Sequence, residues 1–440
     1  MNNAQTIYAL SSGSLPAAIA VVRLSGPSAL KTLSLLGVKD PEPRKLVLSR
    51  LKQDKKEIID IALVCYFPKL ESITGEDLVE LHLHGSIAVV DDLFLFFSSV
   101  KDLRPAEPGE FTRRSLTNGK MGLTEVEGLA DLIAAETKQQ RTQSLSLLKG
   151  ELSAKYYKWR KKLILLRAEI EAILDFSDEG DVLEQFKKNN FTQSICSLIK
   201  DIDKDIAIGA AGERLRKGLK IALIGPPNVG KSSLINVLLK EERAIVSAYA
   251  GTTRDTIEAR LNLEGVPVTI YDTAGIRKTN NKIEEEGVKR SKIAAEAADI
   301  IVFISNAKKQ NANRVLVEPI YKKAKVIYVH NKIDLIKERN LIKKEGFGVS
   351  CKTKEGLNTF LEGLSKEVKK LTHASDLAVG PNRTRHISHL KETKDSLELA
   401  LIEAKADRIE VSADFIRASS ASLGRIIGLV DIEDVLDELF

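Results

Sequence analysis

The amino-acid sequence predicts a multidomain α+β protein in which an α/β domain is inserted into a helical one. Three observations predict this fold class. The chain has 440 residues, more than the roughly 100–200 that one domain usually takes. The period of its hydrophobic pattern changes three times along the chain. Helical patterns also stand on both sides of an alternating strand and helix pattern, as an insertion requires.

The first 120 residues have the pattern of an α+β domain. Short apolar strands bounded by turns are expected at 6–10, 17–24, 58–67 and 78–84. Two helical patterns, at 27–36 and 87–100, interrupt them. A mixed order of strands with a few helices is typical of α+β domains. We therefore expect an N-terminal α+β domain over residues 1–120.

A helical pattern follows this domain. Leu163, Leu166 and Ile170 fall on one face of a predicted helix, and no proline occurs between Pro108 and Pro226. We expect the first part of an all-α helical domain over residues 121–215. The helical pattern returns after the turn at 380–382, so we expect its second part over residues 376–440.

Between the two helical segments, apolar strand patterns alternate with helical patterns. Strands are expected at 220–224, 268–271, 299–304 and 325–330, and helices at 231–239, 283–298 and 357–370. Such alternation predicts a parallel α/β sheet. We therefore expect the inserted domain over residues 216–375.

Composition excludes several classes of protein. Hydrophobic residues make up 43% and charged residues 29%, which argues against a mainly disordered or fibrous chain. No apolar run approaches the roughly 18–20 residues of a membrane-spanning helix. The three cysteines are far apart and suit a reducing compartment. A net charge of +6 is compatible with an RNA partner but also serves solubility. We expect a soluble, cytoplasmic protein.

The strongest chemical signal is the segment GPPNVGKS at residues 225–232, which has the spacing GxxxxGKS. It follows a predicted strand and precedes a predicted helix, as a phosphate-binding P-loop requires. Backbone N–H groups would surround the phosphates there, and the helix N-terminus adds a favourable dipole. Lys231 would reach the β- and γ-phosphates, and the Ser232 hydroxyl would bind Mg²⁺. The residues expected to contact the nucleotide are Asn228, Val229, Gly230, Lys231, Ser232 and Ser233.

Three shorter motifs follow the P-loop in an order that points to guanine. DTAG at 272–275 places Asp272 for water-mediated contact with Mg²⁺ and the Gly275 N–H near the γ-phosphate. In NKID at 331–334, the Asp334 carboxylate can accept from the N1–H and exocyclic amine of guanine, which adenine does not offer. The segment 350–352 would lie against the base. The sequence therefore predicts a GTPase with a Ras-like α/β P-loop G domain, whose base site contains Asn331, Lys332, Asp334, Ser350, Cys351 and Lys352.

The segment AGTTRD at 250–255 supplies a switch loop, in which Thr253 is expected to close the Mg²⁺ shell. Ras-like enzymes place a glutamine directly after DxxG to orient the attacking water, and here that position is Ile276. Hydrolysis must then use another residue or a partner, or be slow. The acidic run at 284–286 could supply a carboxylate, and it could equally be an ordinary acidic helix start.

The chain resembles the MnmE (TrmE) family of tRNA modification GTPases. Its G-domain motifs GPPNVGKSSLIN, AGTTRD, DTAGIR and NKID also match a wider group of GTPases. The assignment to MnmE depends on the flanking segments. TGED at 74–77, LHLHG at 81–85, PGEFTRR at 108–114 and NGK at 118–120 resemble the family's N-terminal signature. Arg385-His386 and the segment 420–430 resemble its C-terminal part, so the resemblance spans the whole chain.

For the first domain, the resemblance implies a fold related to folate-binding aminomethyltransferases, which dimerises and holds 5-formyl- or 5,10-methylene-tetrahydrofolate. The family's folate contacts fall on Arg23, Glu80 and Lys120. The two cations would suit a glutamate tail or a ring carbonyl, and the carboxylate would suit the pterin N–H groups. His82 and His84 share a strand face, but with no third ligand apparent we do not expect a metal there.

For the G domain, the resemblance implies that K⁺ binding makes two G domains dimerise across the nucleotide and accelerates hydrolysis. The cation would stand in for an arginine finger by neutralising charge between the β- and γ-phosphates. Glu284 aligns with the catalytic carboxylate that orients the water, and Arg277 with an arginine that supports this switch region. The implied K⁺ ligands are Asn228, Ser247, Tyr249 and Thr252, and Ser247, Thr252 and Thr253 would join the GTP site.

The resemblance also implies partners. Members of the family act as homodimers with an FAD-containing protein, MnmG (GidA), in a heterotetramer. Together they add an aminomethyl or carboxymethylaminomethyl group to C5 of the wobble uridine, position 34, of certain tRNAs. Tetrahydrofolate supplies the one-carbon unit, and GTP hydrolysis would drive a rearrangement of the complex.

Two segments depart from the family's pattern. The family ends in a Phe-Cys-Ile-Gly-Lys tail, whereas this chain stops at Glu438-Leu439-Phe440. We expect either a truncation or a branch without the tail, and in the second case the modification chemistry is in question. The segment 11–16, SSGSLP, stands where the family usually has a Gly-Arg-Gly-containing segment, which weakens the folate assignment.

Two alternative functions stay open. One is a GTP-switched ribosome-assembly factor, although the chain has no KH-like GxxG between apolar runs and only 5% aromatic residues. The other is a regulatory dimer that keeps its G domain but has lost modification activity, which the missing tail makes worth testing.

Overall fold

A computed structural model of the chain describes residues 5–53, 57–175, 188–240, 258–272, 296–308, 324–336, 346–372 and 380–429. Within these ranges, the side chains at 172–175, 188–190, 258 and 272 are not described. The chain divides into two compact units, one of residues 1–127 with 427–440 and one of residues 128–426. Each unit contains a six-stranded sheet.

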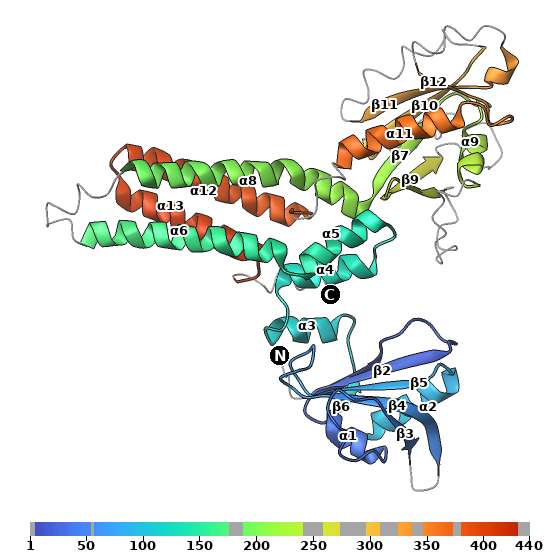
Figure 1. Ribbon diagram of the computed structural model, residues 1–440, viewed down its shortest axis with the longest axis vertical. Coiled ribbons are helices and arrows are strands. Elements are labelled where there is room, and N and C mark those ends of the chain that lie inside the picture. Colours follow the sequence, from blue (N-terminus) through green and yellow to red (C-terminus); the bar gives the residue numbers. More distant parts are fainter. Residues whose placement is uncertain are drawn as a thin grey trace, which may run out of the picture. The chain divides into compact units, whose positions relative to one another are not determined.

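The sheet of the first unit has the order β3-β4-β5-β2-β1-β6 (Figure 1). Its neighbouring strands pair antiparallel, except that β1 and β6 pair parallel. The strands β1, β4 and β5 have the bounds that the sequence predicts. The strands are β1 (Thr6–Leu10), β2 (Ile19–Ser25), β3 (Val47–Lys52), β4 (Ile58–Phe67), β5 (Leu78–His84) and β6 (Leu103–Pro105).

One face of this sheet is covered by the helices α1 (Ala29–Leu35) and α2 (Ile87–Ser99). Alternate residues of the strands point toward these helices because side chains of a strand alternate between its two faces. Leu81, Leu93 and Phe97 are fully buried in this core, and burying such side chains stabilises the fold by about 1.5–3 kcal/mol each. The first unit is therefore an α+β domain, as predicted.

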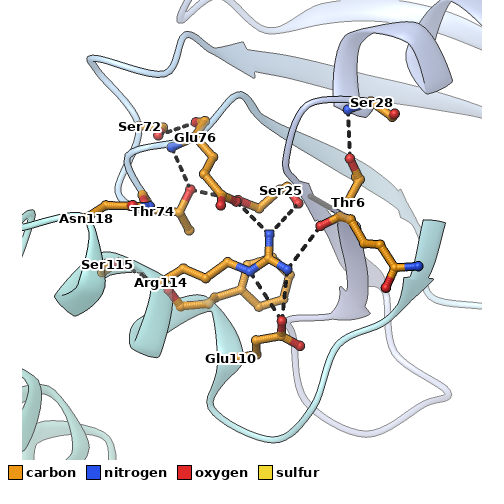
Figure 2. Close-up of polar contacts among 12 residues, drawn as sticks. Thr6, Ser25, Ser28, Ser72, Thr74, Glu76, Glu110, Arg114, Ser115 and Asn118 are labelled. Atoms are coloured by element: carbon orange, nitrogen blue, oxygen red, sulfur yellow. Dashed lines mark hydrogen bonds and ion pairs between the residues drawn. The ribbon is translucent and has the colours of Figure 1, made fainter. Parts of the chain in front are cut away.

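A third helix, α3 (Glu110–Thr117), is fixed to the sheet by a buried ion-pair network around Arg114 (Figure 2). The Arg114 guanidinium, which is 3% exposed, contacts Glu110 Oε1 and Glu76 Oε2, both at 2.9 Å. Glu110 also accepts two hydrogen bonds from Arg104 of β6. Burial raises the pKa of Glu110, but hydrogen bonds from Arg104, a backbone N–H and Arg114 outweigh this effect and lower the pKa to about 2. The charged residues of the segments 74–77 and 108–114 therefore hold α3 on the sheet.

The second unit contains a bundle of long helices. Figure 1 shows these helices running side by side, with α13 packed against α6 and α12, and α12 packed against α8. Helices that precede the α/β segment in the chain therefore pack with helices that follow it, as the insertion pattern predicts. The bundle consists of α6 (Glu151–Asp175), α8 (Lys188–Lys217), α12 (Thr384–Lys405) and α13 (Ile409–Ile426), and the shorter helices α4 (Leu123–Ile133) and α5 (Lys138–Leu148) precede it.

The sheet of the second unit has the order β12-β11-β10-β7-β9-β8 (Figure 1). All its pairs are parallel except β8 and β9, which form a hairpin at one edge. Helices α9 (Lys231–Leu238) and α11 (Leu357–Thr372) contribute to its core. The strands are β7 (Leu219–Ile224), β8 (Glu258–Leu263), β9 (Val266–Asp272), β10 (Ile300–Asn306), β11 (Lys325–Asn331) and β12 (Phe347–Val349).

The predicted fold class is confirmed by this combination of an α+β unit, a helical bundle and an inserted parallel α/β sheet. The β7 strand lies between β9 and β10, so the chain leaves it on one side and later returns on the other. In open α/β sheets, ligands bind beyond the carboxyl ends of the strands at such a reversal point. Among the described helices, none is both long and apolar enough to cross a membrane.

Candidate nucleotide-binding site and N-terminal polar site

The P-loop joins the end of β7 to the start of α9, where the sequence predicts it. Its path requires two glycines. A Cβ at Gly225 would lie 2.1 Å from the carbonyl oxygen of Ile304 on the neighbouring strand β10. A Cβ at Gly230, where φ is +100°, would lie 2.3 Å from Asn331 Nδ2. The loop therefore passes too close to the backbone of β10 and to Asn331, at the end of β11, for any other residue at these positions.

Lys231 begins α9 and is almost fully buried, at 7% exposed. Its Nζ donates to the carbonyl oxygens of Gly225 and Pro226 at 2.8 and 3.0 Å. These contacts hold the ammonium group against the P-loop. Ser232 and Ser233, in the first turn of α9, are exposed. A cation, two hydroxyls and the N-terminus of a helix therefore meet at one place, which suits a phosphate chain and its metal ion.

Asn331 connects this loop with the segments that follow β11. It ends that strand and is 2% exposed. Its Nδ2 donates to the carbonyl oxygen of Val229 at 2.8 Å. Its Oδ1 accepts from the backbone N–H groups of Lys332 at 2.8 Å and Cys351 at 3.2 Å. One side chain thus joins three segments that are far apart in the sequence.

The other residues of the NKID motif also have fixed positions. Lys332, at φ +68°, donates from Nζ to the carbonyl oxygen of Asn228 at 2.9 Å. Asp334 lies in a short 3₁₀ helix, Ile333–Leu335, and its carboxylate is exposed. The hydroxyl of Ser350, which is fully buried, donates to Asp334 Oδ1 at 2.8 Å. This bond orients an exposed carboxylate that can accept hydrogen bonds from a purine edge.

The segment 350–352 lies beside Asn331 and Asp334. Cys351 packs partly against the core of the sheet. Burial raises the pKa of the Cys351 thiol, which keeps it uncharged at neutral pH. Lys352 is exposed.

Several predicted site residues lie outside the described residues. Asp272 is described only as the last residue of β9, without its side chain. The other predictions outside the described residues concern the switch loop, the DTAG glycine, the K⁺ ligands other than Asn228 and the catalytic pair. They fall on Ser247, Tyr249, Thr252, Thr253, Gly275, Arg277 and Glu284.

The structure also shows a contact that the sequence pattern did not reveal. The Ser305 hydroxyl of β10 lies 2.7 Å from His330 Nδ1 of β11, and both residues are buried. The two residues are adjacent in the sheet, one position before the ends of their strands. This bond ties β10 to β11 directly beside Asn331. The signal for this contact in the sequence was a polar residue near the carboxyl end of each of the two predicted strands.

In the first unit, the structure brings together two of the three predicted folate contacts. Arg23 and Glu80 are directly opposite each other on β2 and β5, and Arg23 Nε lies 2.8 Å from Glu80 Oε1. His82 Nε2 lies 3.3 Å from the other oxygen, Glu80 Oε2. Glu80 is 17% exposed in its side chain, and Arg23 is 36% exposed. The carboxylate is therefore held from two sides while it keeps contact with solvent.

Lys120 lies in a different environment, after the end of α3. Its Nζ donates to the carbonyl oxygen of Leu70 at 2.7 Å. Two neighbours hold the same loop: Ser115 donates to the carbonyl oxygen of Ile73 and Asn118 to that of Thr74, each at 2.7 Å. Within the described residues, no hydrogen bond or ion pair joins Lys120 to Arg23 or Glu80.

Comparison with protein families gives two matches that together span most of the chain. Residues 6–120 match the model described as the GTP-binding protein TrmE N-terminus. Residues 123–440 match the model described as the MnmE helical domain.

Individual relatives match over almost their full length. A protein of Bradyrhizobium sp. (strain ORS 278), named tRNA modification GTPase MnmE, is 42% identical over 99% of this chain and 97% of its own length. A protein of the same name from Rhodopseudomonas palustris (strain ATCC BAA-98 / CGA009) is 43% identical over the same shares. Among solved structures, a variant of Aquifex aeolicus Era bound to GDP and AlF4⁻ is 24% identical over 40% of this chain and 66% of its own, with a TM-score of 0.27.

Proposed function

Because the chain belongs to the MnmE family of tRNA modification GTPases, we propose that it is a K⁺-activated GTPase that serves the modification of certain tRNAs. The observation that carries the GTPase part is the contact of Asn331 with the P-loop, together with the Asp334 carboxylate held by Ser350. This arrangement supports guanine recognition at one end of the site and phosphate binding at the other.

In this proposal the nucleotide lies along the carboxyl edge of the parallel sheet. Lys231 and the N-terminus of α9 bind the phosphates, and Asp334 accepts from the guanine N1–H and amino group. Binding of phosphate at Lys231 exchanges its bonds to the carbonyl oxygens of Gly225 and Pro226 for bonds to the ligand. The base keeps a fixed position relative to the phosphates because Asn331 connects the two parts of the site.

The two described residues of the proposed cation sites suit Mg²⁺ and K⁺. The Ser232 hydroxyl is exposed in the first turn of α9, and the Asn228 side chain is exposed on the P-loop. Ser232 and Thr253 would hold Mg²⁺, and the K⁺ ligands would be Asn228, Ser247, Tyr249 and Thr252. Both cations, when bound, neutralise negative charge on the phosphates. Glu284 would orient the attacking water, since Ile276 cannot, and Arg277 would support that segment.

We propose further that the first unit binds a one-carbon tetrahydrofolate and dimerises. The polar pair Arg23 and Glu80 supports this, because a partly exposed carboxylate fixed by a cation can accept from the paired N–H groups of a pterin edge. Lys120 would contribute from the segment that follows α3. With an FAD-containing MnmG partner, the chain would add an aminomethyl or carboxymethylaminomethyl group to C5 of uridine 34. The proposed domain bounds are 1–120, 121–215, 216–375 and 376–440.

The experiment is complementation of a bacterial strain that lacks its own MnmE, followed by mass spectrometry of its tRNA nucleosides. The wild-type chain should restore the modified wobble uridine, and a Lys231→Ala variant should not. Normal modification by the Lys231→Ala variant would contradict a role for GTP in the reaction. Absence of modification with the wild-type chain would favour a regulatory dimer without modification activity.

A further inference from the structure

A groove of about 660 Å³ lies between α6 and α8 of the helical bundle. We call it the α6–α8 groove. The residues of α8 that line it recur at intervals of three or four positions, so they share one face of that helix. The lining consists of Lys162 from α6 and of Gln193, Ser194, Cys196, Ser197 and Lys200 from α8.

The described lining of this groove is positively charged. Its two charged residues are lysines, and none of the described residues that line it is acidic. Within the described part of the chain, neither lysine makes an ion pair. The first three acidic residues that follow Lys200 in α8 are each paired with another lysine. These pairs are Asp201 with Lys204 at 3.0 Å, Asp203 with Lys394 at 2.7 Å and Asp205 with Lys155 at 2.5 Å.

The remaining groove residues offer hydrogen-bond donors. Two serine hydroxyls and a glutamine amide line the groove together with the two lysines, and none of the three side chains makes a hydrogen bond within the described residues. On α6, Lys158 is exposed one turn before Lys162 and extends the row of cations by about 6 Å. As far as the described residues show, the groove thus presents unpaired cations and unpaired donors together.

We propose that the α6–α8 groove binds the phosphodiester backbone of an RNA. Lysine, serine and glutamine side chains are the usual donors to phosphate oxygens in nucleic-acid complexes. A protein partner is less suited, because the described lining residues include no aromatic or aliphatic side chain to form the apolar centre of a protein interface. Since the proposed function makes tRNA the substrate, tRNA is the RNA in question, and this inference rests on that function.

The test is the affinity of the full chain for a fluorescein-labelled tRNA transcript, measured by fluorescence anisotropy between about 50 and 200 mM KCl with GDP present throughout. In the double variant Lys162→Gln/Lys200→Gln, we expect the affinity to fall about 10-fold. We also expect the slope of log affinity against log salt to decrease by about 1.5, because two phosphate contacts are lost.

The matched control is Lys204→Gln, which removes the same charge one turn further along α8, where Lys204 is 75% exposed and paired with Asp201. It should leave both the affinity and the slope unchanged, and no variant should change basal GTP hydrolysis. An equal loss of tRNA affinity in the control would overturn the proposed binding site and would indicate a general charge effect. The same affinity in the double variant and the wild type would also overturn it.

A second arm separates the two possible sources of the phosphate chemistry. Isothermal titration calorimetry with inorganic phosphate compares the wild type with the double variant. We expect the two proteins to give the same result, with no phosphate binding that depends on the two lysines. Phosphate binding that depends on the two lysines, with tRNA affinity unchanged, would mean that the groove takes a free anion. Absence of tRNA binding by the wild-type chain would contradict the proposed tRNA substrate itself, and the groove with it.

Discussion

Asn331 is hydrogen-bonded to Val229: its side-chain Nδ2 donates to the Val229 carbonyl oxygen at 2.8 Å. The bond joins the end of β11 to the middle of the P-loop. On its other side, Asn331 accepts from the backbone N–H of Cys351 in the segment that lies beside Asp334. The parts of the site that would contact phosphate and base are therefore connected through one buried amide.

Replacing Asn331 by alanine should weaken nucleotide binding. The change leaves the Val229 carbonyl and the Cys351 N–H without their partner, and each lost buried bond costs about 1–3 kcal/mol. We expect the affinity for a fluorescent GDP analogue to fall by about 10-fold or more. Asn358→Ala, on an exposed position of α11, is the matched control. Equal GDP affinity in the two variants would show that Asn331 does not organise the site.

Asp334→Asn should change the preferred base. The carboxylate is held by Ser350 at 2.8 Å, so an amide in its place would present a donor where guanine also presents donors. We expect GTP affinity to fall about 10–100-fold, since hydrogen bonds to a charged group are worth about 1.5–3 kcal/mol. Affinity for xanthosine triphosphate, whose ring has a carbonyl in place of the amino group, should rise. Competition binding with both nucleotides measures this, and retained GTP selectivity would mean that the base site is elsewhere.

Arg114→Met should destabilise the first unit strongly. The variant removes the cation between Glu110 and Glu76, which are 3% and 12% exposed, and breaking a buried pair costs about 3–5 kcal/mol. The neighbouring Arg113→Met is the control, because Arg113 pairs with Glu107, which is 62% exposed, and such pairs contribute about 0–1 kcal/mol. Urea unfolding followed by circular dichroism compares the two. Similar midpoints for both variants would contradict a structural role for the Arg114 network.

The same network predicts a dependence of stability on pH. The pKa of Glu110 is lowered from its ordinary value of 4.5 to about 2 in the folded chain. A lowered pKa means that its contribution is fully present above pH 4.5 and is lost as the pH falls from there toward about 2. In Glu110→Gln, the loss of stability over this window should be smaller than in the wild type. Acid titrations of unfolding, run in parallel on both proteins, measure this difference. An equal loss of stability in the two proteins would contradict the assignment.

Much of the architecture could be predicted because local pattern and tertiary structure agree. The strands β1, β4 and β5 and the transition from β7 through the P-loop to α9 lie where the sequence places them. The strands β3, β6 and β8 were not predicted. Each of them lies at a sheet edge. In β3, three of the six residues are exposed and only Leu51 is buried, so its apolar pattern is weak. β6 has only three residues. In β8, Ala259, Leu261 and Leu263 are buried at alternate positions, so a strand pattern was present in the sequence there.

The pairing of charged residues could not be predicted in the same way. Arg114 is 38 residues from Glu76, and Arg23 is 57 residues from Glu80, so no local spacing indicates that they meet. The register of β2 against β5 decides the second pair, and the placement of α3 on the sheet decides the first. The sequence indicated that these residues matter, and the structure shows which residues each of them contacts.

The measurement that tests the central claim most directly is steady-state GTP hydrolysis in KCl and in NaCl at equal ionic strength. In the proposed site, K⁺ neutralises negative charge on the phosphates, and Ile276 stands where Ras-like enzymes have a glutamine. We therefore expect a marked increase in hydrolysis rate in KCl alone. Equal rates in the two salts would contradict a K⁺-activated site and would leave a GTPase of a different mechanism.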